Sequence, residues 1–326
     1  MNTNLQASLT APIEEYLNYF EEVYWESLKS EVELINKVIG YISRKKGKQL
    51  RPRLCLLSAR LCGEPTENTF RAAALIEMIH VATLIHDDVV DDAELRRGWP
   101  SINRVWKNKL SILVGDFMFS KALTNMIHLK DFDALQILST TAERLSQGEI
   151  NQIEKAIKKN ITEDAYYTMV SDKTASLFSA SCQLGAMTVT KEKDKRNSLA
   201  QFGEKFGLVF QIKDDLLDIT GNVEGLGKHA GFDLKKNIIT LPMIHLFDNL
   251  DPSESNKVKR KLNNHVRKSE LKEIRKLIEQ YGGIQFAERQ IDRLSAEARE
   301  ALNIFPQSIY KDSLISTLEF NINRKR

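Results

Sequence analysis

The chain has 326 residues, of which 42% are hydrophobic and 28% are charged, with only 7 prolines and 15 glycines. This balance is typical of a folded, helix-rich protein and excludes a chain that is disordered throughout. The 47 basic and 44 acidic residues give a net charge of +3, which is too balanced to indicate a nucleic-acid-binding protein.

The three cysteines, Cys55, Cys62 and Cys182, are odd in number, lie in apolar sequence and form no CxxC pair. This usage predicts buried thiols in a reducing compartment rather than disulfides or a zinc site. The N-terminal residues have neither the basic nor the apolar region of a signal peptide, and no stretch of 18 apolar residues occurs. We therefore expect a cytoplasmic protein.

Apolar residues recur at three- and four-residue spacing along most of the chain, which predicts long helices. In chain order, clear examples cover residues 71–92, 111–129, 133–157 and 165–189. The breaks at 97–101, 158–164, 220–233 and 249–255 have the composition of helix connections. The charged segment 257–280 predicts an outer helical hairpin with a solvated face. The fold class expected is all-α, with a single domain over residues 1–326.

Two helical segments end in the same pattern of aspartates, HDDVVD at 86–91 and KDDLLD at 213–218. On an α-helix, Asp87 and Asp91 lie about 40° apart around the axis and about 6 Å apart along it. Asp214 and Asp218 repeat this spacing, and stacked carboxylates repel unless a cation lies between them. A solvated acidic face is one interpretation. The apolar sequence before each cluster favours the other, a divalent metal site.

Oxygen ligands of this kind suit Mg²⁺, which usually joins one or two carboxylates to substrate phosphates. Arg96 and Arg97 follow the first cluster, and guanidinium groups bind phosphate oxygens in paired geometry. The sequence therefore predicts two carboxylate walls that face each other across a phosphorylated ligand and Mg²⁺.

A second basic set, with Lys48 and Arg51, precedes a predicted helix that has Pro52 in its first turn. Alone it is an ordinary polar loop, but beside a diphosphate site it becomes a candidate for substrate binding. His80 lies seven residues before Asp87, about 20° away around the helix. Both a satisfied core histidine and a ligand contact remain open for it.

These motifs together resemble the all-trans isoprenyl (polyprenyl) diphosphate synthases, of the long-chain type that makes octaprenyl and heptaprenyl diphosphates. The resemblance rests on GKQLRP (47–52), HDDVVDDAELRRG (86–98), ILVGDFMFSKA (112–122), the Lys173 and Thr174 pair, GLVFQIKDDLLDITG (207–221) and residues 225–242. It implies the isoprenoid synthase fold, an all-α barrel of antiparallel helices around a central cavity.

The resemblance also implies roles for individual residues, carried over by motif position. It implies Mg²⁺ binding by Asp87, Asp88, Asp91, Asp214, Asp215 and Asp218, and catalytic contacts near the allylic carbon by Thr174 and Gln211. The allylic diphosphate would be bound by Arg96, Lys173 and Lys228, and isopentenyl diphosphate by Lys48, Arg51, His80 and Arg97. One departure is Ile238, which stands where the family often has lysine; Lys235 or Lys236 is a candidate substitute.

The implied reaction condenses isopentenyl diphosphate with an allylic diphosphate, which would be farnesyl diphosphate or a similar primer. In farnesyl-specific relatives, bulky aromatic residues before the first aspartate close the product cavity, whereas this chain has Ala82 and Thr83 there. An open pocket predicts a long product of about C30 to C45, for a quinone side chain. Leu75, Met78, Phe117 and Phe119 are candidates for its floor.

Several alternatives remain open at the level of sequence. They are a short-chain synthase that makes geranylgeranyl diphosphate, a class I terpene cyclase and a non-catalytic subunit. The second DDxxD pattern argues against a cyclase, whose second metal motif usually contains Asn, Ser, Thr and Glu. The resemblance implies a homodimer, with the 112–127 helix as a candidate interface, no nucleic-acid partner, and peripheral membrane association for product release.

Overall fold

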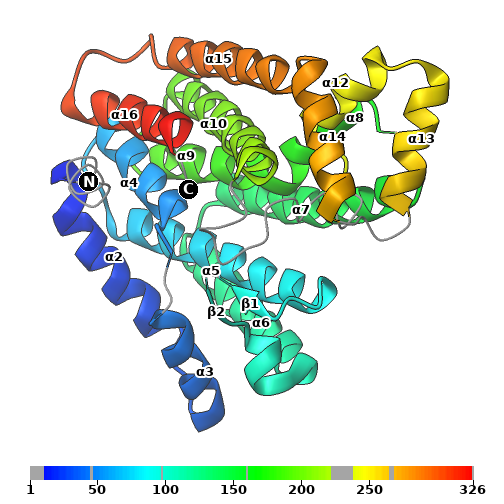
Figure 1. Cartoon of the computed structure of the whole chain (residues 1–326). Coiled ribbons are helices and arrows are strands. Elements are labelled where there is room, and N and C mark those ends of the chain that lie inside the picture. The colour runs from blue at the N-terminus through cyan, green and yellow to red at the C-terminus, as the bar shows by residue number, and fades with distance from the viewer. Residues whose placement is uncertain are drawn as a thin grey trace. The chain divides into compact units, whose positions relative to one another are not determined.

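The computed structural model of the chain describes residues 11–44, 47–96, 98–158, 161–221, 238–263 and 268–324 (Figure 1). Four residues discussed above, Arg97, Lys228, Lys235 and Lys236, lie outside these described residues. The chain divides into two compact units. The expectation of one domain over residues 1–326 stays a prediction.

The first unit comprises residues 1–142, 177–203 and 301–317. Its described elements are η1 (Ala11–Ile13), α2 (Glu14–Ser27), α3 (Glu33–Ser43), α4 (Leu50–Cys62), α5 (Glu67–Val90), β1 (Leu95–Arg96), β2 (Trp99–Pro100) and α6 (Ile102–His128). It also contains the start of α7 (Phe132–Lys158), almost all of α9 (Ser176–Met187), the start of α10 (Lys193–Thr220) and most of α16 (Ile309–Asn323).

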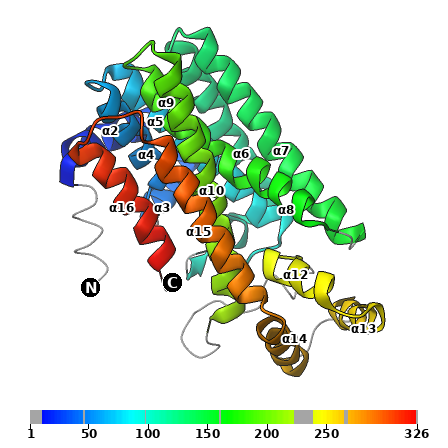
Figure 2. The ribbon, with the colours of Figure 1, turned by 90° about the horizontal axis from the view of Figure 1, so that it is seen from above.

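The second unit comprises residues 143–176, 204–300 and 318–326. It takes the remainder of α7, α10 and α16, with α8 (Glu163–Val170), the π-helix η2 (Ser171–Ala175), α12 (Leu241–Asn249), α13 (Pro252–Asn263), α14 (Lys268–Gln280) and α15 (Gly283–Ala301). The short helices α12, α13 and α14 lie together in both ribbon views (Figures 1 and 2). In α13 and α14, buried Val258, Leu262, Leu271, Ile274 and Ile278 recur at helical spacing.

The all-α fold class is confirmed, since β1 and β2 are the only strands among the described residues. The break predicted at 97–101 lies in the connection between α5 and α6, which also contains a short antiparallel hairpin in which Arg96 pairs with Trp99. The segment 165–189 is helical as predicted, up to Met187, but the helix includes a wide π-turn between α8 and α9. Periodicity does not distinguish a regular helix from one that contains an extra residue.

Helix α5 is the central helix of the first unit and packs against α2, α4 and α6. A capping box at its N-terminus joins the side chains and backbone N–H groups of Thr66 and Thr69, which fixes where the helix begins. Residues 72–76 are fully buried, so this part of α5 contacts protein on all sides. The helix is therefore a rigid support for the aspartates at its C-terminal end.

The cysteine thiols are all free, as the sequence predicted. Cys55 and Cys182 are buried, and Cys62 is only partly buried. Burial raises the pKa of Cys182 to about 12 and that of Cys62 to about 11. These thiols are therefore protonated and poorly nucleophilic at neutral pH.

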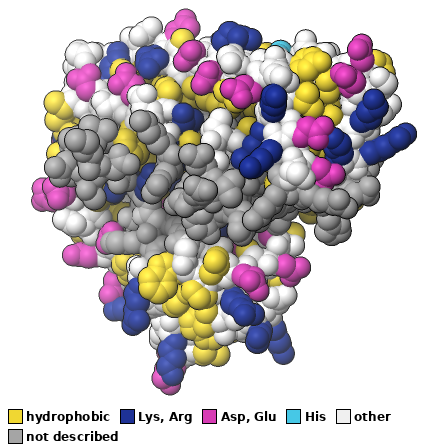
Figure 3. All heavy atoms as spheres, viewed as in Figure 1, with side chains coloured by type: hydrophobic (Ala, Val, Ile, Leu, Met, Phe, Trp, Pro, Cys, Tyr) yellow, Lys and Arg dark blue, Asp and Glu magenta, His cyan; other side chains and the backbone are white. Residues whose placement is uncertain are grey.

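Charged side chains of both signs are interspersed over the face shown in Figure 3, in keeping with the balanced composition. Among the described residues, α6 alone is long and apolar enough to cross a membrane by length and composition. A single helix of this kind is weak evidence for a membrane span, because core helices of soluble proteins pass the same test.

Gly185 allows α9 to approach α4 closely. A Cβ atom at this position would lie 2.1 Å from the backbone carbonyl oxygen of Cys55, which cannot move without displacing α4. We expect Gly185→Ala to reduce the free energy of unfolding by about 1 to 3 kcal/mol, as overpacked cores do. Urea denaturation followed by circular dichroism measures this difference.

Gly40 in α3 provides the matched control, since a Cβ atom there meets nothing within 4 Å. Gly40→Ala should leave stability unchanged or raise it by roughly 1 kcal/mol, because alanine has the higher helix propensity. Equal stability of the two variants would contradict the close packing of α4 and α9.

Candidate functional site

The first aspartate cluster lies where α5 ends. The N–H of Asp91 donates to the carbonyl oxygen of Asp87 at 2.8 Å, so the two residues keep helical spacing although Asp91 is the C-cap residue. Asp88 is 4% exposed, whereas Asp91 is exposed and Asp87 is half-buried. The cluster therefore has one buried carboxylate beside two that reach solvent.

Arg96 holds the buried carboxylate of Asp88. Its Nε lies 2.8 Å from Oδ1 and 2.7 Å from Oδ2, and the ion pair is largely shielded from water on the aspartate side. The β1–β2 hairpin carries Arg96 back toward the helix end, and Asn103 donates to the carbonyl oxygen of Asp88 at 3.2 Å. A predicted metal ligand and a predicted diphosphate ligand are thus direct partners.

Arg51 and His80 come together from α4 and α5. The Nη1 atom of Arg51 lies 3.1 Å from Nε2 of His80, and its guanidinium stacks over the ring of Phe178 at 4.2 Å. Lys48 lies exposed just before α4, where Gln49 adopts the left-handed conformation. Pro52 lies in the first turn of α4, as the sequence predicted.

A cavity in the first unit adjoins these residues. It is lined by His80, Leu84 and Asp88 of α5, by Arg96, and by aromatic side chains that include Trp25 and Trp99. The lining contains both charged groups and aromatic rings, so it is amphipathic. A ligand with an anionic head and an apolar portion fits this chemistry.

The second aspartate cluster lies near the C-terminal end of α10. Asp215 is 4% exposed, the same value as Asp88, so the two clusters share one pattern of burial. Its Oδ1 accepts from Nε2 of Gln211 at 2.8 Å and its Oδ2 accepts from the hydroxyl of Tyr166 at 2.6 Å. These two bonds fix the plane of the carboxylate.

Asp214 forms an ion pair with Arg324, whose Nη2 lies 2.8 Å from Oδ1. The guanidinium also donates to the carbonyl oxygen of Phe210 and stacks over its ring at 4.3 Å. Burial lowers the pKa of Arg324, and the charge of Asp214 opposes that shift. No pattern in the sequence predicted that Arg324 contacts this cluster.

Lys173 and Thr174 lie in the π-helix η2. The Nζ atom of Lys173 forms an ion pair with Glu149 and donates to Oε1 of Gln152 at 3.1 Å. The Thr174 hydroxyl donates to Oε1 of Gln211 at 3.0 Å. A hydrogen-bonded chain therefore runs from Thr174 through Gln211 to Asp215.

The two candidate chain-length residues lie one turn before the first cluster. Ala82 is fully buried, and the half-buried Thr83 donates its hydroxyl to the carbonyl oxygen of His80 at 2.8 Å. Of the candidate floor residues, Leu75 and Met78 are fully buried and Phe119 stacks on His86. Their part in setting product length stays a prediction.

Within the described residues, the structure brings together Arg51 with His80, Arg96 with Asp88, and Gln211 with Thr174 and Asp215. In the same part of the chain, no three His, Cys, Asp or Glu side chains converge into a preformed metal site. Sequence reasoning missed Tyr166, Glu149 and Arg324, because residues joined only by folding leave no local pattern.

An all-α protein with two such aspartate clusters and adjacent cationic side chains has the donor set of an enzyme that binds a metal–diphosphate complex. Comparison with known families makes this specific. Residues 32–281 match the family model described as polyprenyl synthetase. The chain belongs to this family, and its activity is that of a prenyltransferase.

Curated relatives agree with the family model. The chain is 33% identical to the all-trans-nonaprenyl-diphosphate synthase (geranyl-diphosphate specific) of Rhodobacter capsulatus, over 99% of each chain. It is 32% identical to octaprenyl diphosphate synthase of Escherichia coli (strain K12), over 92% of this chain and 93% of that one. It is 38% identical to heptaprenyl diphosphate synthase component 2 of Geobacillus stearothermophilus, over 69% and 70%.

Solved structures agree as well, and they confirm the isoprenoid synthase fold. A decaprenyl diphosphate synthase of Rhodobacter capsulatus superposes with a TM-score of 0.93 at 31% identity, over 98% and 99% of the two chains. A polyprenyl synthase of Caulobacter crescentus CB15, in complex with calcium and isoprenyl diphosphate, superposes with a TM-score of 0.91 at 30% identity, over 98% of each chain. A geranylgeranyl pyrophosphate synthetase of Pyrococcus horikoshii superposes with a TM-score of 0.88 at 31% identity, over 97% of this chain and 98% of that one.

Tyr166 orients the carboxylate of Asp215, so its hydroxyl should affect metal affinity without touching the metal. We expect Tyr166→Phe to weaken the binding of Mn²⁺, used as a probe for Mg²⁺, by about tenfold, the usual effect of losing a group that orients a ligand. Paramagnetic resonance titration of the protein with pyrophosphate present measures this affinity.

Tyr167→Phe is the matched control, because that hydroxyl bonds Gln290 instead. The Tyr167→Phe variant should bind Mn²⁺ with wild-type affinity. Identical Mn²⁺ titrations for the two variants would show that the bond from Tyr166 to Asp215 does not affect metal binding.

Proposed function

We propose that the chain condenses isopentenyl diphosphate with an allylic diphosphate, farnesyl diphosphate or a similar primer, and makes a long-chain all-trans polyprenyl diphosphate of about C30 to C45 for a quinone side chain. The observation that carries this proposal is the repeated aspartate cluster. In each cluster the second aspartate, Asp88 or Asp215, is buried, whereas the other aspartates are more exposed to solvent. Family membership and relatives named for long products support it.

Mg²⁺ is the metal that suits these residues best. Asp87, Asp88, Asp91, Asp214, Asp215 and Asp218 would hold it, and all six supply the oxygen donors that Mg²⁺ prefers. Bound there, the metal would neutralise charge on the departing diphosphate. The lack of a preformed cluster among the described residues is compatible with an ion that keeps several waters and takes substrate oxygens.

Cationic side chains would bind the two diphosphates. Arg96, Lys173 and Lys228 would contact the allylic diphosphate, and Lys48, Arg51, His80 and Arg97 would contact isopentenyl diphosphate. The approach of Arg51 to His80 supports the second assignment, because it brings a guanidinium next to a histidine that lines the cavity beside α5. Hydrogen bonds to diphosphate oxygens stabilise negative charge as the carbon–oxygen bond breaks.

The chain's own residues then protect and orient the reactive carbon. Thr174 and Gln211 would lie near the allylic carbon, where their mutual hydrogen bond fixes both dipoles. Apolar walls would exclude water from the allylic cation until the double bond of isopentenyl diphosphate attacks it. The proton lost afterwards would go to the released diphosphate, so no protein base is required, and the attacking double bond makes a protein nucleophile unnecessary.

The buried helix face before the first cluster would set the product length. Ala82 and Thr83 are small, so the growing prenyl chain would pass beside them rather than stop. A longer product then buries more apolar surface in the protein.

A homodimer is the proposed assembly. Exposed apolar side chains gather on α6 and at the start of α7, including Leu113, Leu123, Ile127 (70% exposed) and Phe132 (87% exposed). Burying such a patch against a second copy would remove it from water. We retain cytoplasmic localisation, with peripheral membrane contact for release of the apolar product, and no nucleic-acid partner.

Two other functions have specific support. A geranylgeranyl pyrophosphate synthetase is among the similar structures, which favours a C20 product as the second candidate. The relative called component 2 is named as part of a heptaprenyl synthase with more than one component, so a second chain is the other candidate requirement. A terpene cyclase has no such relative among those compared above.

Incubation with farnesyl diphosphate, labelled isopentenyl diphosphate and Mg²⁺ tests the function. We expect products of about C30 to C45 after dephosphorylation, and none when EDTA removes the metal that the carboxylates need. Product that stops at C20 would refute the long-chain assignment. No elongation, even with excess Mg²⁺, would refute the activity of the chain by itself.

Replacement of Ala82 with phenylalanine tests the chain-length assignment. The ring should narrow the product path and shift the longest product toward C20, with little loss of the first condensation. Product chromatography measures the shift. Ala73→Phe in the same helix, a buried alanine two and a half turns earlier, controls for general damage to packing. Unchanged product length in Ala82→Phe would exclude this residue as the determinant.

A further inference from the structure

The π-helix η2 is the local device that presents Lys173 and Thr174. The N–H of Ser176 donates to the carbonyl oxygen of Ser171, five residues earlier, instead of four as in an α-helix. One extra residue is therefore accommodated in this turn. Wide turns of this kind are rare and commonly occur at functional sites, which raises the question of what holds this one open.

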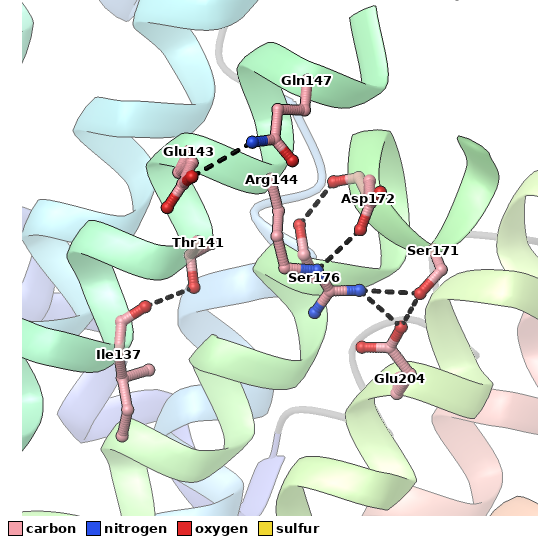
Figure 4. Close-up of polar contacts among 9 residues, drawn as sticks. All are labelled: Ile137, Thr141, Glu143, Arg144, Gln147, Ser171, Asp172, Ser176 and Glu204. Carbon is pink, nitrogen blue, oxygen red and sulfur yellow. Dashed lines mark hydrogen bonds and ion pairs between the residues drawn. The ribbon is translucent and has the colours of Figure 1, made fainter. Parts of the chain in front are cut away.

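Arg144 of α7 holds the first two residues of the turn (Figure 4). Its Nε donates to Oδ1 of Asp172 at 2.7 Å, and its Nη2 donates to the hydroxyl of Ser171 at 2.7 Å. The same Nη2 lies 3.1 Å from Oε1 of Glu204 in α10, and that carboxylate also accepts from the Ser171 hydroxyl. We call Arg144, Ser171, Asp172 and Glu204 the clamp.

The charges within the clamp are complementary, since Arg144 lies between the carboxylates of Asp172 and Glu204. Burial by itself lowers the pKa of Arg144, but the hydrogen bond to Asp172 and the charge and hydrogen bond of Glu204 outweigh burial, and the pKa is raised. The guanidinium is therefore charged at any physiological pH. Its planar array of donors reaches three side-chain partners from one residue, which the single ammonium of lysine does less well.

The following two residues of the turn, Lys173 and Thr174, are themselves proposed for the reaction and contact both flanking helices. Lys173 contacts Glu149 and Gln152 of α7, and Thr174 contacts Gln211 of α10. At Gly148 the two backbones nearly touch, since a Cβ atom there would lie 2.6 Å from the backbone nitrogen of Lys173. The clamp and these contacts therefore hold the turn from both flanking helices.

We propose that Arg144 and Glu204 are positioning residues for the prenyl transfer, which keep η2 in its wide form so that Lys173 and Thr174 face the substrate. The proposal rests on the proposed function. If the turn relaxed to a regular α-helix, the residues after it would rotate about the helix axis by about 100° relative to the residues before it. Lys173 and Thr174 would then lose their present directions without any change in their chemistry.

Arg144→Met tests the proposal, because it removes the guanidinium and keeps an unbranched apolar side chain in place of the arginine's aliphatic part. We expect kcat/KM for the allylic substrate to fall by roughly 10- to 100-fold, the effect of misplacing reacting groups by about 1 Å. The fall should appear in kcat and in the KM for the allylic substrate, with the KM for isopentenyl diphosphate unchanged. Pyrophosphate binding, measured by calorimetry with Mg²⁺, should weaken in parallel.

Lys205→Met is the matched control. Lys205 is the next residue after Glu204 in α10, and its ion pair with Glu297 is similarly exposed but does not touch η2. Loss of this pair should leave kinetics and pyrophosphate binding near wild type. If Arg144→Met and Lys205→Met behave alike in both assays, the clamp has no positioning role.

A double-variant comparison separates positioning from folding. In a Lys173→Met background, Arg144→Met should have little further effect on pyrophosphate affinity, because the side chain that it positions is already absent. Full additivity of the two changes would overturn the proposal. Arg144→Lys retains the charge and should restore part of the affinity.

If Arg144→Met does not fold, as judged by circular dichroism, Glu204→Gln gives the same test with a smaller perturbation. It should raise the KM for the allylic substrate several-fold, and wild-type kinetics would count against the clamp. Failure of the proposed function can be distinguished from failure of the clamp proposal, because in the first case the wild-type protein would form no polyprenyl product. Failure of the clamp leaves wild-type elongation intact.

Discussion

Repulsion between stacked carboxylates is the constraint on which the rest of this structure depends. Each aspartate cluster places like charges one helical turn apart, which destabilises a helix in the absence of a cation. In both clusters the second aspartate is buried and satisfied by protein: Asp88 by Arg96, and Asp215 by Gln211 and Tyr166. The protein thus buries one carboxylate of each cluster and leaves its neighbours more exposed to solvent.

Two different chemical means serve this common end. Arg96 supplies a full positive charge to Asp88 across a short hairpin, whereas Tyr166 and Gln211 supply neutral hydrogen bonds to Asp215. A charged partner offsets carboxylate repulsion directly, while neutral donors fix orientation and keep the negative charge available. The duplicated sequence pattern therefore conceals different hydrogen-bond donors for the two buried aspartates.

Close backbone approach complements these polar contacts. Glycines at 148 and 185 stand where a neighbouring backbone leaves no room for a Cβ atom, beside Lys173 and Cys55 respectively. At Gly148 the approach brings α7 against the wide turn η2, and Arg144 then reaches Ser171 and Asp172 from the same helix. Packing and hydrogen bonding together hold a turn that local sequence preference does not specify.

The sequence by itself determined the all-α class, most helix positions, the family and the paired aspartates, because these depend on periodicity and on residues that are close in the chain. Tertiary structure alone decided that Arg96 bonds Asp88, that Tyr166 and Arg324 join the second cluster, and that residues 171–175 form a π-helix. Tyr166 and Asp215 lie 49 positions apart, and Arg144 and Glu204 lie 60 apart. Contacts at such separations follow from the packing of whole helices, and no local pattern encodes them.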